Sequence, residues 1–129
     1  MIRLLAPLFF IIPAITVGQD LPDEDWFCNT KNPFQVSSDV GNFEIVETPS
    51  YIFNPMRGVR EYDNKEFYSS SCRENVQAAS FICSSTLAPD VELLFHFNTV
   101  SKTFNYVKSI MSKRGGNTVV TILGICSKL

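Results

Sequence analysis

The sequence predicts an α+β protein in which one α-helix packs on a curved antiparallel sheet stabilised by disulfide bonds. Alternating apolar residues over 91–97 and β-branched residues over 118–125 indicate strands. Hydroxyl and carboxylate side chains at Ser37-Ser38-Asp39 are typical of a helix N-terminus. The four cysteines are an even number in a chain of 129 residues, which favours disulfides in a small secreted protein.

Residues 1–18 have the composition of a secretory signal peptide. Arg3 supplies a positive charge, residues 4–17 are mostly apolar, and small residues precede Gln19. The apolar stretch is shorter than the roughly 20 residues of a membrane-spanning helix. We therefore expect a secreted protein with no membrane anchor and with one folded domain, residues 19–129.

The charge of the chain limits its partners. The net charge is −2, and it becomes −3 when Arg3 leaves with the signal peptide. This balance argues against a protein that holds nucleic acid by bulk charge. Residues 101–129 nevertheless carry five basic residues and no acidic one. A solvated surface is the simpler interpretation of this basic end, and a phosphate-binding or partner-binding patch is the alternative.

Along the mature chain, the helix is expected to begin near residue 37 and to end before Pro49, with Val40 and Phe43 at helical spacing. Residues 43–46 also suit a strand, because β-branched side chains lose rotamer freedom in helices. Residues 54–67 are rich in turn formers, and residues 76–83 predict a buried strand.

The second half of the chain predicts further strands. In residues 91–97, Leu93, Phe95 and Phe97 share one face, while Leu94 and His96 lie on the other. Residues 104–107 form another extended stretch, residues 113–117 a basic turn, and residues 118–125 the last strand.

Four cysteines allow three pairings, and the sequence alone does not choose among them. We favour Cys28–Cys126, which ties the two ends of the mature chain together, and Cys72–Cys83, which closes a short loop. Metal ligation by these cysteines would require a C-x-x-C pair or a nearby histidine, and the sequence has neither. We expect no metal and no cofactor.

The segment Trp26-Phe27-Cys28 resembles the aromatic-x-Cys motif that small secreted candidate effectors of powdery mildew fungi carry after the signal peptide. Cys126 matches the partner cysteine near their C-terminus. Many members of that group resemble the fungal guanyl-preferring ribonucleases. Residues 36–40, 93–97 and 115–120 are similar to the helix entry, the central strand and a later strand of those ribonucleases. The resemblance implies a ribonuclease-like fold and an effector role.

Departures from the ribonuclease pattern imply that catalysis is lost. Ribonucleases of this kind cleave RNA with a general base, a general acid and a phosphate-stabilising arginine. In this chain Leu94 stands at the glutamate position, and a shift of two residues along the strand would place His96 there instead. Thr118 stands at the arginine position and Asn64 at a histidine position. His96 is the only histidine, and Glu92 on the same face is about 13 Å away along a strand.

The resemblance therefore implies a secreted, non-catalytic effector, a virulence protein that is delivered into plant cells and there binds a host protein or RNA. An intracellular plant immune receptor of the NLR class is one such partner, which would give the protein an avirulence function. Any RNA contact is expected to be weak and to use Tyr106, Lys108, Lys113 and Arg114. We expect a monomer. The alternatives are an active ribonuclease that uses His96, and an unrelated disulfide-rich secreted binder such as an inhibitor or toxin.

Overall fold

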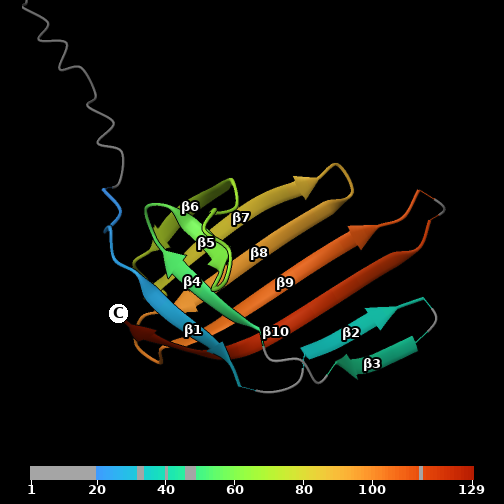
Figure 1. The fold of residues 1–129 in the computed structure, drawn as a ribbon, viewed down its shortest axis with the longest axis horizontal. Coiled ribbons are helices and arrows are strands. Elements are labelled where there is room, and N and C mark those ends of the chain that lie inside the picture. Colours follow the sequence, from blue (N-terminus) through green and yellow to red (C-terminus); the bar gives the residue numbers. More distant parts are fainter. Residues whose placement is uncertain (1–19, 32–33, 40, 46–48, 114) are drawn as a thin grey trace, which may run out of the picture.

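The computed structural model describes residues 20–31, 34–39, 41–45, 49–113 and 115–129, so the expected leader lies outside the described residues. These residues form one antiparallel sheet of ten strands (Figure 1). The strands are β1 (Trp26–Thr30), β2 (Phe34–Ser38), β3 (Gly41–Ile45), β4 (Ser50–Asn54), β5 (Gly58–Glu61), β6 (Ser70–Asn75), β7 (Ser80–Ala88), β8 (Val91–Asn98), β9 (Thr103–Met111) and β10 (Asn117–Lys128).

The prediction of a ribonuclease-like α+β fold is wrong, because the described residues contain no helix and the fold is all-β. The segment expected to be the helix forms the β2–β3 hairpin instead. Its β-branched and aromatic residues favour an extended chain, and β10 offers it a strand to pair with, Val36 opposite Val120. The side chains expected to cap the helix bond within and beside the hairpin. Ser37 Oγ donates to Asn42 Oδ1 across the hairpin (2.8 Å), and Asp39 Oδ2 accepts the N–H of Asn117 at the start of β10 (3.3 Å).

The sheet wraps around until its two ends nearly meet. Strands β6 to β10 follow one another as a meander, β4 and β5 form a hairpin, and β1 lies between β4 and β10, so that β5 and β6 are the two ends of the sheet. Where β5 approaches the chain that enters β6, the Tyr68 N–H donates to the Val59 carbonyl (2.8 Å). Gly58 permits this approach, because it has a φ of +106° and a Cβ there would lie 2.8 Å from the Ser70 side chain. The result is a nearly closed, barrel-like sheet.

The long strand β10 belongs to two parts of the sheet. Residues 124–128 pair with β1, whereas residues 118–121 pair with β2. Gly124 allows β1 to come close, since a Cβ at this position would collide with the Asn29 carbonyl oxygen. The β2–β3 hairpin consequently lies beside the first half of β10, away from β4 and β5 (Figure 1).

Aromatic side chains fill the inside of the wrapped sheet. Leu93, Phe95 and Phe97 are at most 2% exposed, which confirms the face predicted for this strand. Phe53 of β4 stacks on Phe95 with ring centroids 5.0 Å apart, and Trp26 lies 4.9 Å from Phe97. Full burial of each such side chain stabilises the fold by about 1.5–3 kcal/mol. The inner face is therefore a packed core.

The other predicted elements are confirmed in part. The expected strands at 104–107 and 118–125 lie within β9 and β10. The expected strand at 76–83 begins only at Ser80, because the preceding residues form a turn in which Val76 is 71% exposed and Ala79 has a φ of 47°. The turn-rich segment 54–67 contains β5, which the sequence did not reveal.

The structure contains the disulfides Cys28–Cys126 and Cys72–Cys83, the pairs that the sequence favoured. Each links two directly opposed residues of neighbouring strands, Cys28 of β1 with Cys126 of β10 and Cys72 of β6 with Cys83 of β7. The first disulfide is buried and spans 98 residues, whereas the second spans 11.

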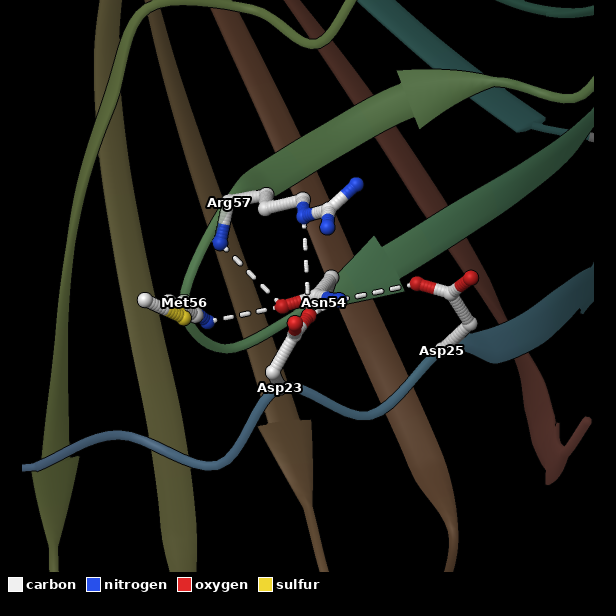
Figure 2. Close-up of polar contacts among 5 residues, drawn as sticks. All are labelled: Asp23, Asp25, Asn54, Met56 and Arg57. Carbon is white, nitrogen blue, oxygen red and sulfur yellow. Dashed lines mark hydrogen bonds and ion pairs between the residues drawn. The ribbon is translucent and has the colours of Figure 1, made fainter.

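The acidic residues before β1 are held by the turn between β4 and β5 (Figure 2). The buried Asn54 side chain donates to Asp23 Oδ1 and to Asp25 Oδ1, both at 2.8 Å. Its oxygen accepts the N–H groups of Met56 and Arg57 at 2.9 and 3.2 Å. Every hydrogen-bonding position of one amide is thus engaged, and the start of the described chain is fixed against the sheet. Within the described ranges no helix has the length and apolar character needed to span a bilayer.

We predict that the two disulfides differ in their effect on stability. Because the entropic gain grows with loop length, replacing Cys28 and Cys126 together by alanine should lower the free energy of unfolding by about 5 kcal/mol, and replacing Cys72 and Cys83 by about 3 kcal/mol. Urea unfolding of both double variants and the parent protein measures the difference. An equal loss in the two variants would contradict the loop-length argument.

Candidate binding surface

The outer face of strands β6 to β9 carries an open depression with a volume of about 790 Å³. Its residues are cross-strand neighbours in two adjacent rows. Ser71, Ser84, Leu94 and Val107 lie opposite one another in the first row. The second row contains Thr86, Glu92 and Ser109. The remaining lining residues are Ser69, Ser70, Ser85 and Leu93.

The depression exists because side chains alternate across a strand. In β8 the odd-numbered residues enter the core, so Glu92 and Leu94 are left on the outside, where Leu94 is 45% exposed. The same alternation places the small side chains of Ser84 and Thr86 outside on β7. Small hydroxyl side chains beside a larger leucine and valine leave the surface hollow at this point.

The depression combines hydroxyl groups with apolar side chains. Most of its lining side chains carry hydroxyl groups, Leu94 and Val107 add apolar contact area, and Glu92 is the one ionisable residue in the lining. Beneath the depression, on the inner face, the Ser70 and Ser85 hydroxyls share a hydrogen bond of 2.6 Å that joins β6 to β7, and Ser70 also donates to the Tyr68 carbonyl (3.0 Å). Hydroxyl groups donate and accept, so the lining can form hydrogen bonds with a polar ligand.

His96 lies on the same outer face but outside the depression. Its cross-strand neighbours are Ile82 and Asn105. Glu92 faces Thr86 and Ser109 instead, four residue pairs further along the strands. In the described part of the chain, no hydrogen bond or ion pair joins His96 to a carboxylate. The arrangement does not form the acid–base pair that RNA cleavage requires.

The residues that the ribonuclease resemblance placed in an active site are separated. Leu94 points to the outside of β8, whereas Thr118 lies in the inner row with Ile110. Asn64 belongs to the turn after β5, where its carbonyl accepts from Arg60 (2.9 Å). The described residues contain no group of three or more histidine, cysteine, aspartate or glutamate side chains that could hold a metal ion.

The residues expected to contact RNA do not form a single exposed surface. Tyr106 is 4% exposed, and its ring is stacked on Tyr51 with centroids 5.0 Å apart. Lys108 is half-buried on the inner face between Leu93 and Val120, while Lys113 is exposed in the turn after β9. Arg114 lies outside the described residues. Protein already covers the ring of Tyr106, so base stacking on it would require a rearrangement.

Three tyrosines and one carboxyl group gather at the end of the aromatic core. Tyr51 lies opposite Glu61, and the Tyr68 hydroxyl donates to Glu61 Oε1 (3.0 Å). Burial, followed by the hydrogen bond to Glu61, raises the pKa of Tyr68 to about 12. Burial is also the main cause that raises the pKa of Tyr51 and Tyr106 well above the usual value for tyrosine, and the neighbouring phenols and Glu61 add to it. The three phenols therefore keep their protons at physiological pH.

Comparison with known proteins gave no match among protein-family models, curated proteins or solved structures. The depression was also missed by the sequence interpretation, which ended the strand of β7 at residue 83. A signal for it was present in the three consecutive hydroxyl residues Ser84, Ser85 and Thr86, but their partners on β6 and β9 are distant in the sequence.

We predict that the tyrosine cluster makes the stability depend on pH above 10. The unfolded chain loses its phenol protons near pH 10, whereas the folded chain retains them, so the free energy of unfolding is fully maintained below pH 10 and falls as the pH rises further. In Tyr106→Phe this fall should be less steep, by up to about 1.4 kcal/mol per pH unit. Urea unfolding between pH 9 and 11.5 measures both slopes. Identical slopes would contradict the assignment of Tyr106.

Proposed function

We propose that the protein is a secreted, non-catalytic binding protein that contacts a partner protein through the depression on the outer face of β6 to β9. The observation that carries the proposal is this depression itself, a lining of hydroxyl groups around Leu94 and Val107. A mixed surface of this kind combines hydrogen-bonding groups with apolar contact area, as protein interfaces do.

The disulfides support the secreted location. Four of four cysteines are paired, and disulfides persist in oxidising compartments. They fit with the expected leader at residues 1–18. The plant host, the effector role and recognition by an immune receptor rest on the resemblance of Trp26-Phe27-Cys28 to the powdery mildew effectors, and they remain part of this proposal.

The structure gives that three-residue motif a physical role. Trp26 and Cys28 both face the core, since they are two residues apart on β1, and the residue between them faces outward. Trp26 packs on Phe97 and carries the Lys102 ammonium 4.8 Å from its ring, while Cys28 forms the disulfide to Cys126. The motif therefore anchors the first strand, and it leaves the outer face of the sheet available for a partner.

Lack of ribonuclease activity is a direct prediction of this proposal. The purified protein should leave single-stranded RNA uncut, and His96→Ala should give the same result, because His96 has no carboxylate in its cross-strand row. Gel analysis of a labelled RNA after prolonged incubation provides the measurement. Cleavage that disappears in His96→Ala would favour the alternative of an active ribonuclease.

The depression is tested by two matched leucines of the outer face. Leu94 lies in the depression and is 45% exposed, whereas Leu123 on β10 lies outside it and is 47% exposed. Immobilised wild-type protein and Leu123→Arg should retain the same proteins from a leaf extract, and Leu94→Arg should lose them, because the long cation fills the hollow. Quantitative mass spectrometry of the retained proteins reads out the comparison. Equal retention by all three would exclude the depression, and no specific retention by the wild type would exclude the binding function.

A further inference from the structure

Strand β3 is an exposed edge of the sheet. All five of its residues are exposed, and among the described strands it pairs with β2 alone. Phe43 is 47% exposed and Ile45 36%, although both belong to a regular strand. In Figure 1 the strand lies at the margin of the molecule, with β2 between it and β10. An unpaired edge of this kind is a template for another strand.

The hydrogen-bond pattern of the sheet defines which groups of β3 face outward. The Lys31 N–H donates to the Leu123 carbonyl (3.1 Å), so the odd-numbered residues of β10 direct their backbone groups toward β1 and β2. The backbone groups of Ser37 and Gln35, which lie opposite odd-numbered residues of β10, therefore form hydrogen bonds to β10. Because backbone groups alternate in direction along a strand, those of Val36 point the other way and pair with Phe43 of β3. By the same alternation, the N–H and C=O groups of Asn42 and Glu44 point away from β2.

We propose that two copies of this chain associate through their β3 strands, antiparallel and about a two-fold axis at Phe43. In this register Asn42 of each copy lies opposite Glu44 of the other, and all four outward N–H groups and all four outward C=O groups of the two strands are paired. Phe43 meets Phe43 of the second copy as a non-hydrogen-bonded pair, in which side chains approach most closely. The two sheets join into one continuous sheet.

Charge selects this register over its neighbours. A shift of one residue pair toward the C-terminus would place Glu44 opposite Glu44 of the second copy, and like charges directly opposite each other are destabilising. A shift in the other direction would place Asn42 opposite Asn42 and would leave Glu44 without a partner in the strand. In the Phe43-centred register the Glu44 carboxylate, which already accepts from Gln35 Nε2 (2.8 Å), faces an amide that can donate to it.

The strand lacks the features that normally prevent such pairing. Its five residues, Gly41-Asn42-Phe43-Glu44-Ile45, contain no lysine and no proline. The contact is small, since only five residues of each copy take part, and small interfaces are weak. We therefore infer a dissociation constant between about 10 µM and about 1 mM, so that the dilute protein is the monomer that the sequence led us to expect.

Two measurements test the dimer. Sedimentation velocity of the protein from micromolar to millimolar concentration should show a reversible shift from monomer to dimer. The shift should be lost in Asn42→Pro, which removes an outward N–H group, leaves the backbone hydrogen bonds to β2 in place, and gives up only the side-chain bond from Ser37. A chain that remains monomeric at 1 mM would overturn the proposal, as would a dimer that Asn42→Pro leaves intact.

Single cysteines test the register. Under mild oxidation, Phe43→Cys should form a disulfide-linked dimer, because the Cα atoms of a non-hydrogen-bonded pair are about 4.5 Å apart. Asn42→Cys and Glu44→Cys should not, since in this register each residue is displaced from its own copy by about 6.6 Å along the strand. Val100→Cys, 78% exposed in another turn, measures random oxidation. Faster cross-linking of Glu44→Cys than of Phe43→Cys would reject the two-fold axis at Phe43.

Discussion

Insertion of β1 between β4 and β10 is the constraint on which the rest of the structure depends. Without β1, the β4–β5 hairpin would lose its lateral connection to β10, and a two-stranded hairpin is at best marginally stable in water. Three contacts besides the backbone pairing hold β1 in place. Cys28 forms a disulfide with Cys126, and the Trp26 side chain is buried in the core. The Asn54 amide donates to Asp23 and Asp25, just before the strand. Strand β1 thereby joins the β4–β5 hairpin to the rest of the sheet, and the sheet can close around its core.

Closure of the sheet gives it an inner face filled by core side chains and an outer face exposed to solvent. The aromatic residues that fill the interior also bury Tyr106 and part of Lys108, which sequence reasoning had assigned to a binding surface. Along each strand, every second side chain points to the outer face. On β6 to β9 several of these outward side chains are small hydroxyl groups, and the surface there is hollow. A slip of one residue in the pairing of β7 and β8 would move Leu94 into the core and remove the depression, so the depression depends on the strand register.

The length of β10 has a second consequence. Because β10 extends beyond its pairing with β1, its first half pairs with the β2–β3 hairpin. Among the described residues of this hairpin Val36 is buried, but none belongs to the aromatic core. The hairpin can therefore present an edge strand while the core retains its packing. The depression on β6 to β9 and the edge of β3 lie at different parts of the sheet, so the proposed partner and the proposed second copy would not compete for the same residues.

The sequence by itself determined the features that depend on local pattern: the even cysteine count, the buried face of Leu93, Phe95 and Phe97, and the extended character of residues 104–107 and 118–125. It favoured the observed disulfide pairs without excluding the other two pairings. Only the tertiary structure decided the state of residues 34–45, because a helix cap and a hairpin turn use the same hydroxyl and carboxylate residues, and pairing with β10 favoured the hairpin. The depression also required the fold, since Ser71, Ser84 and Val107 become neighbours only through registers between strands that are far apart in the chain. Two-residue periodicity assigns a face to each side chain, but which strands lie next to one another depends on how the whole sheet closes.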